Sequence, residues 1–155
     1  MGMRIFNKDL EESEKAVQAF AKLIANYDVP YELATTEQQR IGIDLISRNT
    51  KYEIKHMSYS DAIAIEETGE CNKPGWIYTS QADKLVEVRE EQEFYIFNFT
   101  EVKWFYEKTK HMYELHYNEE TKGTYENWKS SFRIYPLRDF NGYLKFETVK
   151  IGAKQ

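Results

Sequence analysis

The chain contains one cysteine, Cys71, in 155 residues. A single cysteine excludes an intramolecular disulfide and a thiolate metal cluster within one chain, and it suits a reducing cytoplasm, where we expect the protein. No run approaches the roughly 20 apolar residues of a membrane span. Residues 1–8 also lack the apolar core of a signal peptide. We therefore expect no membrane partner.

Positive charge is also scarce, with 21 Lys and Arg against 26 Asp and Glu and a formal net charge of −5. The chain as a whole therefore lacks the basic footprint of many nucleic-acid-binding proteins, although local basic patches remain compatible with it. With only 3 prolines and no low-complexity tract, we see no linker and expect one domain over residues 1–155. Aromatic residues make up 15 %, which favours sheets with aromatic packing.

Two short segments with strand composition, residues 42–46 and 51–55, flank the polar tetrapeptide at residues 47–50. Each alternates apolar and polar side chains with a period of two, and the tetrapeptide is rich in turn residues. This pattern predicts a β-hairpin. On its second strand Glu53 and Lys55 are two residues apart, so they share a face.

The register of this hairpin places two carboxylates together. If residues 47–50 form a four-residue loop, Ile46 pairs with Lys51 and Asp44 falls opposite Glu53. Carboxylates held so close raise each other's pKa unless a cation neutralises them. Oxygen ligands suit Mg²⁺, with Mn²⁺ as a substitute.

An Asp followed on the next strand by Glu-x-Lys resembles the catalytic pattern of the PD-(D/E)xK nuclease superfamily. The resemblance implies that Asp44, Glu53 and Lys55 are catalytic. It also implies that Mg²⁺ is held by Asp44, Glu53 and the backbone carbonyl of Ile54, while Lys55 orients a water or stabilises developing charge. The expected fold is α/β, a single restriction-endonuclease-like domain with a central mixed β-sheet flanked by helices.

The resemblance extends over about residues 36–88. Within the superfamily, this segment is similar to a group of phage and bacterial members that are restriction-endonuclease-like or resolvase-like. Four features match: Gln39-Arg40 before Gly-x-Asp, the acidic Glu66 after the Glu-x-Lys strand, Gly75-Trp76 at an expected strand start, and Asp83 before an apolar strand.

A helix is predicted from Asp9, as N-cap, to about Asn26. Glu14 lies on its apolar stripe beside Val17, where a carboxylate is costly without a partner. Two interpretations remain open: Glu14 reaches water from the edge of the stripe, or it points toward the cation, as a Glu of the first helix does in some members of the superfamily.

Residues around the hairpin are candidates for substrate binding or for support of the site. Arg40 and Lys73 could contact phosphate or could be solvated charges. Gly42 lacks a side chain beside Asp44, which lets a nucleic-acid backbone or a neighbouring strand approach. Glu66 and Asp83 are expected to support the ligands from behind, Asp83 as a cap or hydrogen-bond acceptor.

The remaining chain predicts further strands and one more helix. Arg133 could bring a cation to the substrate. Cys71 has no base near it in sequence and receives no catalytic role. The expected elements are strands at residues 62–66, from Trp76, at 94–99, 130–137 and 143–151, a helix capped by Thr100 with a stripe reaching His116, and a polar loop at 118–127.

The leading hypothesis is a metal-dependent endonuclease that hydrolyses DNA, with a homodimer expected if both strands are cut. A second is a non-catalytic nuclease-fold module of phage type that binds or interferes with a host system. The complete Asp, Glu and Lys set argues against it. A third is a small metal-dependent phosphohydrolase acting on nucleotides, which no Gly-rich phosphate loop or His-Asp pair supports.

Overall fold

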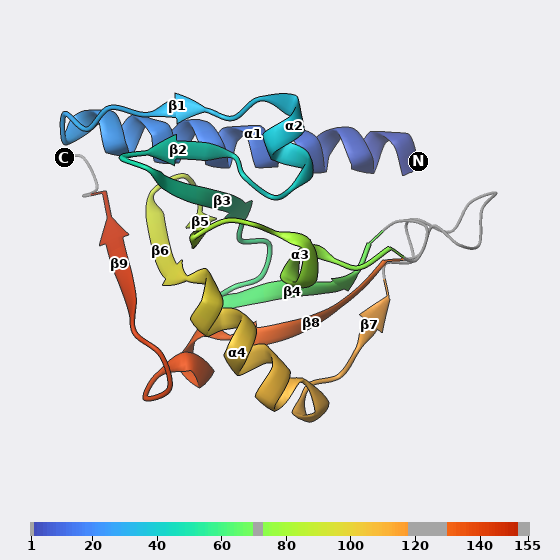
Figure 1. Ribbon diagram of the computed structural model, residues 1–155. Helices are drawn as coiled ribbons and strands as arrows, with labels where there is room; N and C mark the ends of the chain where they lie inside the picture. Colours follow the sequence, from blue (N-terminus) through green and yellow to red (C-terminus); the bar gives the residue numbers. More distant parts are fainter. Residues whose placement is uncertain (1, 70–72, 118–129, 152–155) are drawn as a thin grey trace.

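The computed structural model describes residues 2–69, 73–117 and 130–151. Its helices are interspersed among the strands along the chain (Figure 1). In chain order the elements are α1 (Gly2–Asn26), β1 (Glu32–Leu33), α2 (Thr36–Arg40), β2 (Leu45–Ser47), β3 (Thr50–His56), β4 (Ala62–Thr68), α3 (Trp76–Thr79), β5 (Lys84–Arg89), β6 (Glu93–Asn98), α4 (Phe99–Thr109), the 3₁₀ helix η2 (Lys110–Met112), β7 (His116–Tyr117), β8 (Ser131–Pro136), the 3₁₀ helix η5 (Leu137–Phe140) and β9 (Phe146–Lys150).

Within the described residues the strands form two sheets. The larger has six strands in the order β1-β2-β3-β5-β6-β9, and the smaller has three in the order β4-β8-β7. β3 and β5 run parallel, whereas the other neighbours in the larger sheet are antiparallel. The fold is therefore mixed α/β with a mixed central sheet, as the sequence predicted.

One face of the larger sheet is covered by α1. Phe20 and Ile24 of this helix pack against Leu45, Ile54 and Val86. Small buried residues between the large ones on this face of α1 let the helix lie close to the sheet. The ring centroids of Phe20 and Tyr52 are 5.1 Å apart. This burial removes apolar surface from water and fixes α1 across β3, next to the hairpin.

The other face is covered by the smaller sheet together with α4 (Figure 1). Ile63 and Ile65 of β4 are fully buried there against Leu85 and Phe97 of the larger sheet. The strand expected at residues 62–66 therefore exists but joins the second sheet, not the central one. Its composition identifies a strand but does not specify the partner, which is β8.

The start of α1 and the strand expected from Trp76 were predicted wrongly. α1 begins at Gly2 and not at Asp9, because extending an established helix costs little and residues 3–8 contain no breaker. The segment from Trp76 is the short helix α3 rather than a strand.

The boundaries of α4 also differ from the prediction. The side chain of Asn98, not that of Thr100, caps it by accepting from the amide of Glu101 at 3.1 Å. α4 ends at Thr109, and His116 lies in β7.

The expected strands at residues 94–99, 130–137 and 143–151 are present as β6, β8 and β9, with β9 at a sheet edge. Cys71 and the loop expected at 118–127 fall outside the described residues. In the ranges that the structure describes, no helix is long and apolar enough to cross a membrane.

Candidate functional site

The predicted hairpin is formed by β2 and β3, with a tighter turn than expected. Arg48 and Asn49 have positive φ angles of 51° and 66° and make the turn alone, in place of a four-residue loop. Turns of this kind match the twist of antiparallel strands. Ile46 pairs with Lys51, so the predicted register is confirmed.

Asp44 lies where β2 separates from β3. Its amide donates to the carbonyl of Tyr52 at 2.8 Å. Two residues further along β3, the Asp44 side chain takes the place of a backbone acceptor. Its Oδ2 accepts a hydrogen bond from the amide of Ile54 at 2.8 Å. Burial raises the pKa of Asp44, and neither the Ile54 amide nor the charge of Lys55 fully offsets this. The carboxylate is therefore oriented toward β3 in a place where a nearby cation would favour its ionised form.

Glu53 projects from β3 and is 4 % exposed. Its Oε2 lies 3.0 Å from Nζ of Lys55, which confirms that the two side chains share a face. Its other oxygen, Oε1, is buried and has no hydrogen-bond partner among the described residues. A buried carboxylate oxygen without a partner is costly, so a bound cation would stabilise it.

Lys55 is the cation of this group. Burial acts to lower its pKa, but the carboxylates of Glu53, Asp44 and Glu66 outweigh that effect, and its pKa is raised. The ammonium group therefore stays charged at neutral pH. A charged donor fixed beside two carboxylates can orient a water or stabilise negative charge that develops on a substrate.

Glu87 is part of the same group, and the sequence reasoning missed it. It lies on β5 in parallel register with Lys55 and is 2 % exposed, with Oε2 lacking a hydrogen-bond partner among the described residues. Burial raises the pKa of Glu87 to about 8, with Lys55 opposing the shift and Glu53 adding to it. The sequence feature that could have identified Glu87 is a Glu flanked by Val86 and Val88 in an otherwise apolar strand.

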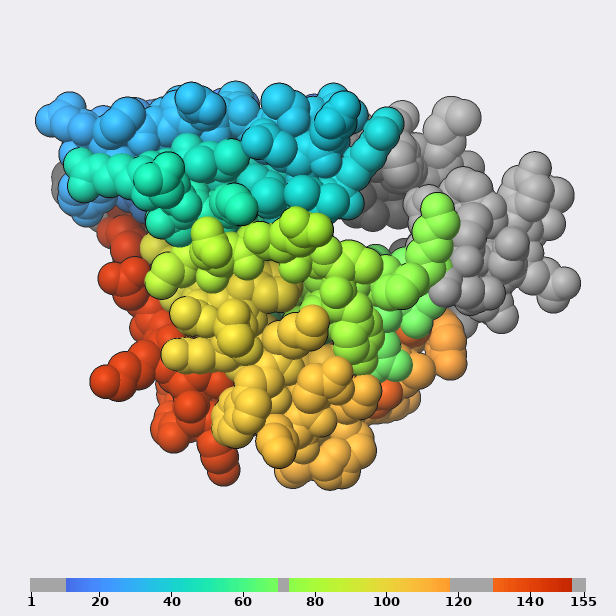
Figure 2. All heavy atoms as spheres, in the orientation of Figure 1, coloured from blue at the N-terminus to red at the C-terminus, as the bar shows by residue number. Residues whose placement is uncertain are grey.

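A cavity of about 580 Å³ opens beside the hairpin. Glu14 of α1 lines it together with Asp44, which fits the interpretation that Glu14 faces the cation, whereas its exposed side chain fits the interpretation that it reaches water. In the space-filling view the cyan atoms of the segment that contains α2 lie directly against the yellow-green atoms of the segment that contains α3 (Figure 2). The cavity is lined by Ser13, Glu14, Val17, Gln18, Leu33, Gln39, Asp44, Glu53, Ile54 and Lys55.

The donor set beside this cavity fits Mg²⁺ or Mn²⁺. Nowhere in the described part of the chain do three His, Cys, Asp or Glu side chains group closely enough to hold a metal ion by themselves, so Glu14 does not complete a three-carboxylate set. Mg²⁺ needs only one or two carboxylates, because it keeps several waters. Asp44 and Glu53 supply two. In an extended strand the N–H and C=O of one residue point to the same side, so the carbonyl of Ile54 faces Asp44.

The three residues expected to contact substrate are not among those that line this cavity. Arg40 and Lys73 are exposed at the surface. Gly42 has a φ of +81°, and a Cβ built on it would lie 2.4 Å from Oγ of Ser80. The close approach that requires a glycine here is therefore made by the protein's own chain. The predicted contacts of these residues with nucleic acid stay predictions.

The two residues expected to support the site do different things. Glu66 on β4 accepts from the amide of Trp76 at 3.3 Å, and its charge acts on Lys55. Asp83 exchanges hydrogen bonds with the backbone of Lys51, through its carboxylate at 2.9 Å and its amide at 2.7 Å. Glu66 thus acts electrostatically on the site, whereas Asp83 fixes the pairing of β3 with β5.

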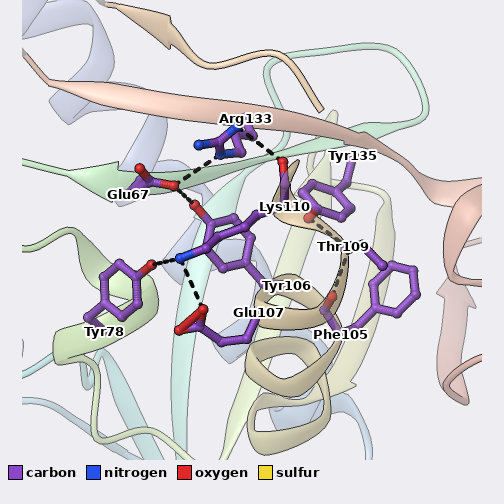
Figure 3. Close-up of polar contacts among 9 residues, drawn as sticks. All are labelled: Glu67, Tyr78, Phe105, Tyr106, Glu107, Thr109, Lys110, Arg133 and Tyr135. Carbon is purple, nitrogen blue, oxygen red and sulfur yellow. Dashed lines mark hydrogen bonds and ion pairs between the residues drawn. The ribbon is translucent and has the colours of Figure 1, made fainter. Parts of the chain in front are cut away.

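A second polar group lies between β4, β8 and α4 (Figure 3). Arg133 donates from Nε to Oε1 of Glu67 at 3.0 Å, and the hydroxyl of Tyr106 donates to the same oxygen. Nη1 of Arg133 donates to the carbonyls of Lys110 at 3.1 Å and Tyr113 at 2.6 Å. The guanidinium therefore joins β8 to β4 and to the end of α4. These internal contacts, and not a substrate, take up the cation that Arg133 could have brought to the substrate.

Lys110 extends this second group toward α3 (Figure 3). Its Nζ lies 3.2 Å from the hydroxyl of Tyr78 and 3.1 Å from Glu107. The same ammonium lies 5.8 Å from the ring centroid of Tyr78 and 5.9 Å from that of Tyr106. Because its charges are paired internally, we interpret this group as a clamp between the smaller sheet and α4.

Scans of the chain against protein-family models, curated proteins and solved structures each found no match.

Proposed function

We propose that this protein is a metal-dependent endonuclease that hydrolyses phosphodiester bonds in DNA, with a restriction-endonuclease-like domain of the PD-(D/E)xK type. The observation that supports this most is the unpartnered, buried Oε1 of Glu53, next to the ion-paired Lys55 and across the hairpin from Asp44. A binding module has no physical need for such a costly arrangement.

The geometry supports a division of labour among these residues. Asp44, Glu53 and the carbonyl of Ile54 hold the cation. When bound there, Mg²⁺ supplies charge neutralisation for the phosphodiester and acidifies water. Lys55 orients the attacking water or stabilises the negative charge that develops at phosphorus.

The charge of the cavity indicates that the metal ion has to bind before DNA does. Three carboxylates line it, those of Glu14, Asp44 and Glu53, against the single cation Lys55, which is already paired. A phosphate would be repelled from such a surface in the absence of a divalent ion. DNA binding at this cavity should therefore itself require Mg²⁺ or Mn²⁺.

The test is a panel of labelled linear duplex, branched and single-stranded DNAs, with RNA in parallel, incubated with Mg²⁺, Mn²⁺ or EDTA. We expect cleavage of DNA with either metal, none with EDTA, and none by Glu53→Gln, which is nearly isosteric with the wild-type residue. Size-exclusion chromatography with light scattering tests the proposed homodimer separately.

The same panel discriminates against the non-catalytic alternative. If the wild-type protein cuts no DNA or RNA with either metal, the nuclease proposal is wrong. Binding of DNA without cleavage would then favour a nuclease-fold binding module of phage type, and turnover of nucleotides alone would favour a phosphohydrolase.

A further inference from the structure

Lys55 makes a second contact besides its ion pair. Its Nζ lies 5.2 Å from the centroid of the Trp76 ring, over the ring face. Attraction between a cation and an aromatic face is largest for Trp and grows as the pair is withdrawn from water. The Lys55 side chain is 33 % exposed, so the contact is partly desolvated.

The indole is brought to this position by a close approach of two backbones. Gly75, just before α3, donates its amide to the carbonyl of Glu67 at 2.8 Å. A Cβ built on Gly75 would lie 2.2 Å from the carbonyl oxygen of Glu66, so the start of α3 fits against β4 only with glycine here. The amide of Trp76 then donates to the Glu66 carboxylate.

The Trp76 ring also makes an edge-to-face contact with another aromatic ring. The ring centroids of Trp76 and Phe99 are 5.9 Å apart, and their planes meet at 66°. The side chain packs, partly buried, against the core between the two sheets. A ring fixed by the backbone and the core is a rigid support for a flexible lysine chain, and its contact helps to offset the rotamer entropy that the chain loses when it is held in one place.

We infer that Trp76 is a positioning residue of the candidate site, whose indole face fixes the ammonium group of Lys55 beside Glu53. It acts through Lys55 and does not itself contact the reacting atoms. The effect on catalysis rests on the proposed nuclease function, whereas the placement of Lys55 does not.

The kinetic test compares Trp76→Leu with Trp76→Phe. A cation–π contact of about 1 to 2 kcal/mol corresponds to a rate change of about 5- to 30-fold. We expect kcat on DNA with Mg²⁺ to fall by that factor in Trp76→Leu, with KM within about threefold of wild type. Trp76→Phe, which keeps an aromatic face, should recover most of the loss. Trp104→Leu is the control, since Trp104 is 52 % exposed on α4.

The placement test is NMR of the lysine side chains in the metal-free protein. The Hε and Hζ resonances of Lys55, assigned by their loss in Lys55→Arg, should be shifted upfield by the indole ring current. The shift should disappear in Trp76→Leu, persist in part in Trp76→Phe and stay unchanged in Trp104→Leu. Should Trp76→Leu not fold, the readout is the partial loss of the shift in Trp76→Phe, and an unchanged shift there overturns the inference.

The two tests separate two failures. If the wild type cleaves nothing but the Lys55 shift depends on Trp76, the nuclease proposal is wrong and the placement stands. If the Lys55 resonances are the same in wild type, Trp76→Leu and Trp76→Phe, the inference is overturned. Equal kcat in wild type and Trp76→Leu, in a protein that cleaves DNA, overturns it as well.

Discussion

The ammonium group of Lys55 lies 3.0 Å from one carboxylate oxygen of Glu53 and leaves the other oxygen buried without a partner. The pair is therefore half-satisfied. The negative charge of Glu53 is balanced through one oxygen by Lys55. Its second oxygen is directed to a place where only a cation, a proton or a water could meet it.

Replacing Lys55 with Ala should abolish most cleavage without removing the cation site. We expect activity to fall by roughly two to four orders of magnitude, the usual loss for a positioned acid–base or electrostatic group. Mn²⁺ affinity should be unchanged or slightly tighter, because a competing cation beside Glu53 is gone. The control is Lys51→Ala, an exposed lysine on the same strand. Equal cleavage by Lys55→Ala and wild type would contradict the mechanism.

Removing either carboxylate should weaken the cation site directly. Glu53→Gln and Asp44→Asn are each expected to reduce Mn²⁺ affinity at least 10-fold by isothermal titration calorimetry, since few other protein ligands remain to hold the ion. Asp83→Asn is the control, because the Asp83 carboxylate binds the amide of Lys51 instead. Similar affinities in all of these proteins would place the ion elsewhere.

Glu87 should make the free energy of unfolding depend on pH. Its folded-state pKa of about 8 lies above the ordinary 4.5, so the folded protein binds this proton more tightly than the unfolded chain. Its contribution is fully present below pH 4.5 and is lost as the pH rises toward 8, by at most about 1.4 kcal/mol per pH unit.

Glu87→Gln cannot ionise, so its free energy of unfolding should vary less over this range and exceed that of the wild type at pH 8. Urea unfolding of metal-free protein at pH 5 to 9 measures this, with the exposed Glu32→Gln as control. Parallel pH profiles for Glu87→Gln and wild type would show that Glu87 is not buried as described.

The clamp around Arg133 should matter for stability. Arg133→Met leaves Glu67 and two backbone carbonyls without their donor, so we expect the free energy of unfolding to fall by about 2 to 4 kcal/mol at pH 7. Arg138→Met, at a residue whose side chain is 83 % exposed, is the control and should change little.

The effect of Arg133→Met should shrink in acid. Burial acts to raise the pKa of Glu67, but the hydrogen bonds from Arg133 and Tyr106 outweigh it, and the pKa is lowered from 4.5. The contribution of Glu67 is therefore present above pH 4.5 and is lost as the pH falls through the lowered value. A difference between variant and wild type that is constant from pH 7 to pH 3 would contradict this role of Glu67.

The hairpin could be predicted from the sequence because its information is local. Alternation with a period of two fixes which residues share a face, and a short polar turn fixes the register. Glu53 and Lys55 on one face and the pairing of Ile46 with Lys51 followed directly. The length of the turn did not, since it depends on Arg48 and Asn49 both adopting positive φ.

The parts of the site that were missed depend on contacts distant in sequence. Glu87 reaches Lys55 through the parallel pairing of β3 with β5, which follows a long connection that includes β4 and α3. Trp76 reaches it because Gly75 packs against β4. Strand composition cannot specify either partner, and it could not assign β4 to a second sheet. Partner choice depends on the packing of the whole core.

The most direct measurement of the central claim is an anomalous-scattering map from crystals of the protein grown or soaked with Mn²⁺. We expect one peak within about 2.0–2.3 Å of carboxylate oxygens of both Asp44 and Glu53 and of the carbonyl oxygen of Ile54, and its absence from crystals of Glu53→Gln. A Mn²⁺ peak elsewhere, with none between Asp44 and Glu53, would contradict the claim that this hairpin holds the catalytic cation.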